Sequence, residues 1–141
     1  MKRMNNRSGF TLLEIIIVII IVGVLASLAL PRFFQTIAFS RSTEALNAIG
    51  VLKRATDRCA LMAGEGTAVD FTNCDTLANI GVEDPGLAAG AFFDYTVALA
   101  GGVLTFTATS KADVANVINV VYDTAAGTIT RNGTGDFSGI K

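Results

Sequence analysis

Few residues in this 141-residue sequence form a pattern that could do chemistry, and those that do are one glutamate and two cysteines. Histidine is absent, so the commonest general base near neutral pH and the commonest metal ligand are both missing. The acidic residues are scattered, and the sequence contains no nucleophile–base pair, no phosphate-binding P-loop and no calcium-loop spacing. We therefore expect a protein that is not an enzyme, with no catalytic residues, no metal site and no cofactor.

The two cysteines, Cys59 and Cys74, are the only thiols in the chain. An even number of cysteines in a chain bound for an oxidising compartment favours a disulfide. Such a bond would close a loop of about 16 residues and stabilise the fold by roughly 3 kcal/mol. Two free thiols are the alternative in a reducing environment. A zinc site is disfavoured, because two cysteines without histidine do not supply enough ligands.

Glu14 lies near the start of an apolar run, Phe10 to Leu30, that is long enough to cross a bilayer as a helix. Bases crowd the residues before this run, which predicts a cytoplasmic N-terminus and places everything after Pro31 on the far side of the membrane. A carboxylate inside a membrane helix is unfavourable and usually functional. The bases are Lys2, Arg3 and Arg7.

Three interpretations of this segment compete. A secretory signal peptide cleaved near Ser27-Leu28-Ala29 would be unusually long, and Glu14 would damage its apolar core. A plain membrane anchor would carry the acid without using it. In the third interpretation, another copy of the chain supplies a partner for Glu14.

The stretch Gly9-Phe10-Thr11-Leu12-Leu13-Glu14, after a short basic leader, resembles the prepilin signal, or class III signal, of type IV pilins and of type II secretion pseudopilins. The resemblance is strong over residues 2–40. It implies that prepilin peptidase removes the leader 1–9 between Gly9 and Phe10 and methylates the new amine of Phe10. Subunits would then wait in the inner membrane as single-pass proteins. An assembly platform would next add them to a helical extracellular filament associated with cell adhesion and motility.

The same resemblance gives Glu14 an assembly role. Cleavage creates a positive amine at Phe10, and Glu14 lies about one helical turn further on. Its carboxylate could therefore meet the Phe10 amine of a neighbouring subunit. Both ions lose hydration in a dry core, so we interpret this pair as a device that fixes register more than as a source of stability.

Gly23 and Pro31 mark weak points in the apolar helix. Pro31 cannot donate a hydrogen bond to the carbonyl of Ser27, and Gly23 is a poor helix former. A gently kinked membrane helix is one interpretation. The resemblance suggests another, in which the segment between these residues melts or stretches when the subunit enters a filament.

The rest of the sequence predicts an α+β fold in which these features are carried by one long helix and a small antiparallel sheet. Apolar residues spaced three to four apart continue the helix to about residue 62, and strict alternation predicts strands on either side of a Gly101-Gly102 turn. The hydrophobic half of the helix should protrude, and the amphipathic half should pack on three or four strands. The expected parts are the leader 1–9, a membrane or filament-core helix 10–31, and a head 32–141 that comprises the helix to about 62, a loop 63–91, a sheet 92–131 and a coil tail 132–141.

Within the head, Asn132-Gly133 is expected to form a turn, and residues 111–116 are expected to connect two strands, with room for one helical turn.

Charge gives no support to nucleic-acid binding, because acids outnumber bases after Phe10. A small basic cluster at Lys53, Arg54 and Arg58 is diluted by Asp57 and is typical of a solvated helix face.

From the resemblance of the N-terminal segment we predict a major pilin, a structural subunit of a type IV pilus. The alternatives are a pseudopilin of type II secretion and, from another class, a monomeric membrane-anchored binding module that keeps residues 1–9.

Overall fold

A computed structural model describes residues 10–64 and 69–140 of the chain. It divides the chain into two compact units, Met1–Thr36 and Ile37–Lys141, which are described separately. The N-terminal leader, including Gly9, lies outside the described residues. The proposed cleavage after Gly9 is therefore not addressed by the fold.

One long helix, α1, runs from Leu12 to Ala63. This confirms the predicted single helix, which was placed from about residue 10 to residue 62. The helix continues through Pro31, which has no N–H to donate to the carbonyl of Ser27. In the first unit the described side chains from Phe10 to Thr36 are all exposed, as expected for a surface that only lipid or other copies of the chain would cover.

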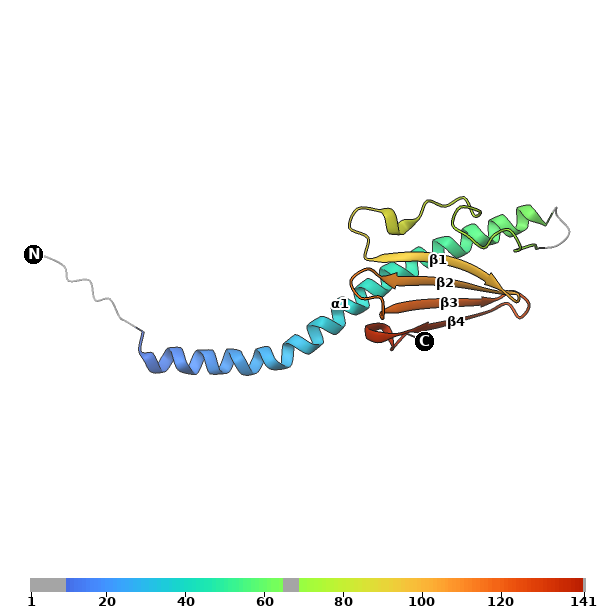
Figure 1. The fold of residues 1–141 in the computed structure, drawn as a ribbon. Coiled ribbons are helices and arrows are strands. Elements are labelled where there is room, and N and C mark those ends of the chain that lie inside the picture. Colours follow the sequence, from blue (N-terminus) through green and yellow to red (C-terminus); the bar gives the residue numbers. More distant parts are fainter. Residues whose placement is uncertain (1–9, 65–68, 141) are drawn as a thin grey trace, which may run out of the picture. The chain divides into compact units, whose positions relative to one another are not determined.

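The second unit contains a four-stranded antiparallel sheet whose strands follow the order β1-β2-β3-β4 (Figure 1). The predicted alternation is confirmed in β1, where Phe93, Tyr95 and Val97 are buried and the residues between them are exposed. Gly101 and Gly102 connect β1 to β2 with φ values of 56° and 79°, which glycine adopts without strain. The strands are β1 Phe93–Ala100, β2 Val103–Ser110, β3 Val117–Asp123 and β4 Thr128–Gly133.

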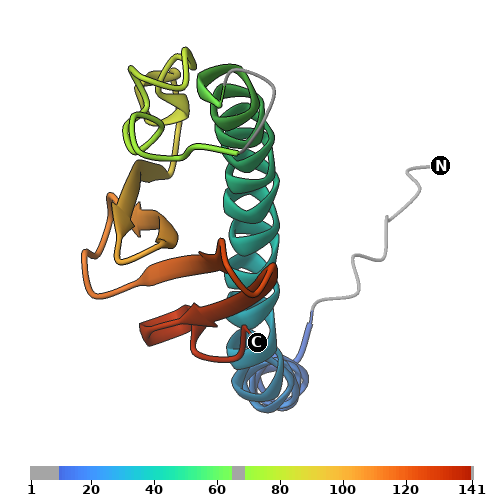
Figure 2. The ribbon, with the colours of Figure 1, turned by 90° about the vertical axis from the view of Figure 1, so that its right-hand side faces the viewer.

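The second half of α1 packs along one face of this sheet (Figure 2). Its buried residues recur every three to four positions, so they form the single stripe that an amphipathic helix presents to a core. The sheet contributes Phe93, Phe106 and Leu104, which are at most 1% exposed. The buried helix residues are Ser42, Ala45, Ile49, Leu52, Ala55, Thr56 and Ala60.

The loop between α1 and β1 contains one short 3-10 helix, η1, at Pro85–Leu87. Asp84 accepts a hydrogen bond from the backbone N–H of Gly86 at 2.8 Å and so fixes the predicted turn. Gly86 is buried against the outer edge of β1, and a β-carbon there would lie 2.9 Å from the carbonyl oxygen of Phe93. Lys111 donates to the Gly86 carbonyl and lies 3.5 Å from Asp94, which holds η1 to the sheet.

The predicted coil tail is wrong in three respects. Asn132 and Gly133 belong to β4 and pair with Asn119 and Ile118, so they do not form the expected turn. The chain then forms a second 3-10 helix, η2, at Gly135–Phe137. Phe137 is 5% exposed, and its ring lies 5.6 Å from that of Phe93.

Gly133 is required by this arrangement, because a β-carbon there would meet the backbone of Phe137. The optional helical turn in residues 111–116 is also absent. That connection is a bend followed by a turn, in which Asp113 accepts from the backbone N–H of Ala115 at 3.0 Å.

Candidate functional site

Thr11 and Glu14 close the N-terminus of α1 with reciprocal hydrogen bonds. The backbone N–H of Thr11 donates to the Glu14 carboxylate at 2.9 Å, and the Thr11 hydroxyl donates to the same oxygen at 2.8 Å. In return, the backbone N–H of Glu14 donates to the Thr11 hydroxyl at 3.3 Å. This is a capping box, which satisfies backbone donors that the first helical turn leaves without partners. Glu14 therefore has a role inside its own chain.

Sequence reasoning identified Glu14 but missed Thr11 as its partner. The signal was present, because Ser or Thr followed three residues later by Glu or Asp, ahead of an apolar run, is the pattern of a capping box. The placement of Glu14 in the first turn also suits the positive end of the helix dipole.

Phe10 is the first described residue, and its side chain is 78% exposed. The helix that follows has the length and apolar composition needed to cross a membrane, and its most apolar 18-residue window has no buried residues.

Gly23 has no neighbouring side chain within 4 Å of where a β-carbon would lie. The helix is continuous from Gly23 to Pro31, so this segment is fully formed in the isolated subunit.

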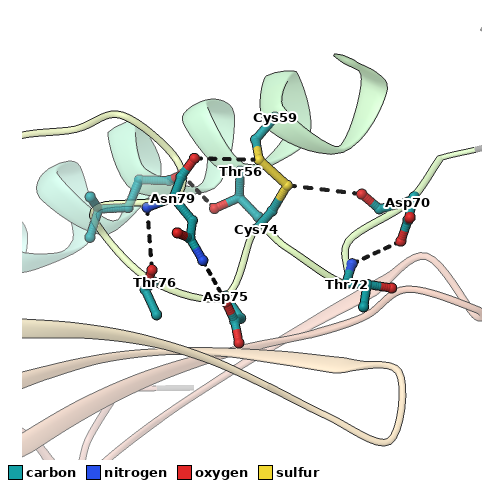
Figure 3. Close-up of a disulfide and its surroundings, with 9 residues drawn as sticks. Thr56, Cys59, Asp70, Thr72, Cys74, Asp75, Thr76 and Asn79 are labelled. Atoms are coloured by element: carbon teal, nitrogen blue, oxygen red, sulfur yellow. Dashed lines mark hydrogen bonds between the residues drawn. A yellow bond between two sulfur atoms is a disulfide. The ribbon is translucent and has the colours of Figure 1, made fainter. Parts of the chain in front are cut away.

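Cys59 and Cys74 form a disulfide that joins the last turns of α1 to the following loop (Figure 3). This confirms the predicted pairing over the free-thiol alternative. Cys74 is buried, and the backbone N–H of Asp70 donates to the carbonyl of Ala60 at 3.1 Å, so the loop is held at two points. Both attachments lie at the C-terminal end of the helix.

Short polar contacts organise the disulfide-bound loop. The side-chain amide of Asn79 donates to the carboxylate of Asp75 at 3.1 Å (Figure 3). Both residues belong to the loop. Hydrogen bonds from the side chain and the backbone N–H of Thr72 lower the pKa of the Asp70 carboxyl. In the described ranges 10–64 and 69–140, no three His, Cys, Asp or Glu side chains are grouped to hold a metal ion.

Comparisons with known proteins address the N-terminal pattern and the whole chain. A family model described as "Prokaryotic N-terminal methylation motif" matches residues 4–30. Fimbrial protein Q of Moraxella bovis is 34% identical over 130 residues, which cover 92% of this chain and 81% of that protein. A fimbrial protein of Moraxella nonliquefaciens is 34% identical over 125 residues, covering 78% of this chain and 80% of that one.

A further relative, type IV major fimbrial protein FimA of Dichelobacter nodosus, is 34% identical over 77 residues, covering 53% of this chain and 49% of that protein. These matches agree with the long helix, its apolar first half and the α+β head. The chain belongs to the type IV pilin family, and it is a structural pilin subunit.

Proposed function

We propose that this pilin is the major subunit of a type IV pilus and that it polymerises through the exposed apolar part of α1. The observation that carries the proposal is that Phe10 lies just before α1, that Glu14 lies in its first turn, and that the described side chains up to Thr36 are all exposed. So large an apolar surface needs a cover, which is lipid before assembly and neighbouring helices afterwards. The names of the relatives support a fimbrial function.

The proposed maturation begins with the leader. Prepilin peptidase cuts between Gly9 and Phe10 on the cytoplasmic side of the inner membrane and methylates the Phe10 amine. The basic leader residues keep this end in the cytoplasm, and the head lies beyond the membrane. An inner-membrane assembly platform then moves the subunit from the bilayer into an extracellular filament.

Glu14 acts in two successive settings. In the membrane, the hydrogen bonds from Thr11 reduce the cost of placing its carboxylate in an apolar surrounding. In the filament, a second oxygen of the carboxylate accepts from the Phe10 amine of a neighbouring copy. An offset between neighbouring helices that leaves the Glu14 carboxylate or the Phe10 amine without its partner in a dry core is disfavoured. The pair therefore selects one register between subunits.

Gly23 and Pro31 bound a segment that we propose to unwind on assembly. Gly23 has no side chain and a low helix propensity, so the helix opens there at little cost. Pro31 leaves one carbonyl without its helical donor. Unwinding lengthens the chain between the membrane-level contacts and the head, which lets both pack at the same time.

The test uses the full-length gene expressed in a cell with a pilus assembly system. Glu14→Ala is expected to leave subunit levels in the membrane unchanged and to abolish sheared surface filaments seen by electron microscopy. Glu44→Ala is the matched control, because Glu44 is an exposed glutamate of the same helix. Normal filaments from Glu14→Ala, or wild-type filaments whose subunits retain residues 1–9 by mass spectrometry, would overturn the proposal.

A further inference from the structure

The charges of the second unit are divided between two parts of the fold. Residues 37–63, the second half of α1, carry four bases and two acids. Residues 64–141, the loop, sheet and tail, carry nine acids and three bases. The helical part of the unit therefore carries a net positive charge, and the remainder carries a net negative charge.

These two parts do not neutralise one another within the chain. Among the described residues, the two ion pairs are Lys53 with Asp57 at 2.7 Å and Lys111 with Asp94 at 3.5 Å. The first lies wholly on α1, and the second lies wholly within the loop and sheet region. Neither connects the helix with the acidic part, so the charge separation persists on the surface of the subunit.

Three arginines in this half of the helix have no acidic partner among the described residues: Arg41, which lies over the ring of Phe92 at 4.7 Å from its centroid, and Arg54 and Arg58. Arg54 and Arg58 are both exposed, and they lie one helical turn apart on α1, whose other side is covered by the sheet and loop (Figure 2). Neither forms a hydrogen bond, ion pair or ring contact with any described residue. A guanidinium nitrogen of Arg54 lies 3.9 Å from where a β-carbon on Gly50 would be, so this side chain lies along the helix.

Glu83 carries the free negative charge of the loop. It is exposed and, alone among the acids in residues 69–140, it has neither a hydrogen bond nor an ion pair there. Asp94 is paired with Lys111. The other acids accept hydrogen bonds from nearby donors and so shape the turns; they are Asp70, Asp75, Asp84, Asp113, Asp123 and Asp136.

We propose that Arg58, with Arg54 beside it, contacts the acidic loop around Glu83 on a neighbouring copy of this chain in the filament. The inference rests on the proposed filament function and adds a contact between heads. A helical polymer repeats one contact between two different surfaces of identical subunits, so a basic surface and an acidic surface on the same chain can satisfy each other throughout. Complementary charge of this kind sets which surfaces meet and in what register.

The experiment exchanges the two charges. Arg58→Glu alone and Glu83→Arg alone are each expected to lower the yield of sheared filaments about tenfold, because each places like charges in the contact. The double variant, Arg58→Glu with Glu83→Arg, restores opposite charges and is expected to return the yield to within about threefold of wild type. Subunit level in the membrane and the N-terminal mass are measured for every variant.

Arg131→Glu is the matched control, because Arg131 is an exposed arginine of β4 without a partner among the described residues. It is expected to keep the wild-type yield. Normal filaments from Arg58→Glu, no recovery in the double variant, or an equal loss in Arg131→Glu would each overturn the inference while leaving the subunit a pilin. Failure of the wild-type chain to form filaments after correct processing would instead overturn the proposed function, and this inference with it.

Discussion

Thr11 and Glu14 hydrogen-bond to each other in both directions at the start of α1, with the Thr11 hydroxyl 2.8 Å from the Glu14 carboxylate. The acid that we propose to act between subunits is thereby hydrogen-bonded within its own subunit before any contact exists. Capping, which the structure shows, and assembly, which we propose, are two different roles for this side chain, and substitutions at the two residues distinguish them.

The first prediction concerns Thr11. Thr11→Ala removes the N-cap and should weaken the start of the helix by about 1 kcal/mol, while the Glu14 carboxylate that we propose to act between subunits remains. Filament yield, measured by shearing, should therefore fall only modestly, whereas Glu14→Ala should eliminate filaments. Thr11→Ser keeps a capping hydroxyl and serves as the control. Equal loss of filaments in Thr11→Ala and Glu14→Ala would mean that Glu14 acts only as a cap.

The second prediction concerns the disulfide. Cys59→Ser with Cys74→Ser should lower the free energy of unfolding by about 3 kcal/mol, because the loop regains its freedom in the unfolded chain. Limited proteolysis of the detergent-solubilised chain should cut the loop between residues 69 and 91 more rapidly. The strands should remain protected, since neither cysteine lies in the sheet. Thr72→Ala is the control for a loop substitution that keeps the bond.

The third prediction compares two glycines. Gly86→Ala should destabilise the head by about 1–3 kcal/mol, because the added carbon would lie 2.9 Å from the Phe93 carbonyl oxygen. Gly139→Ala adds the same atom where nothing lies within 4 Å and should be nearly neutral. Denaturant unfolding of the full chain in detergent measures both. Equal midpoints for the two variants would show that η1 can move away from β1 without cost.

The fourth prediction concerns the tail. Phe137→Ala removes a ring that is 5% exposed and should destabilise the head by about 3–5 kcal/mol. Val114→Ala truncates a side chain that is 76% exposed and should have little effect on thermal unfolding. A small effect at Phe137 would indicate that the tail docks on the head only weakly.

The fifth prediction concerns alkaline pH. Burial, together with the negative charges of Glu44 and Asp84, raises the pKa of Tyr95 to about 12. The unfolded chain loses this proton near the ordinary value of about 10, so folding is favoured less as pH rises between about 10 and 12. Tyr95→Phe has no proton to lose there and should unfold with a weaker pH dependence in that range. Parallel pH profiles for the two proteins would contradict the prediction.

The sequence predicted the elements whose signal is periodic. The long helix follows from apolar spacing that continues past Pro31, and β1 follows from alternation between Phe93 and Ala100. The tail was missed because it docks through the contact of Phe137 with the core of the head. No local sequence pattern predicts a tertiary contact of this kind. The turn predicted at Asn132-Gly133 was wrong for a related reason. Asn-Gly usually marks a turn, but here both residues belong to β4 and the glycine makes room for the backbone of Phe137.

The candidate site was predicted in part. Glu14 and the cysteine pair were found because their types are unusual for their surroundings. Thr11 was missed although Thr-x-x-Glu ahead of an apolar run is the pattern of a capping box, because an acid in an apolar run also suggests a partner in another chain. The division of charge between Arg58 and Glu83 needed the fold, since only the fold shows which charged side chains already have partners.

The strictly sequential order of the sheet also constrains how the head forms. Every strand pairs with its neighbour in the chain, so the sheet can grow by successive hairpins with short searches between them. Neither cysteine lies in a strand, so the pairing of the strands does not depend on the bond that links the loop to the helix. The hairpins of the head can thus form whether or not the thiols have been oxidised.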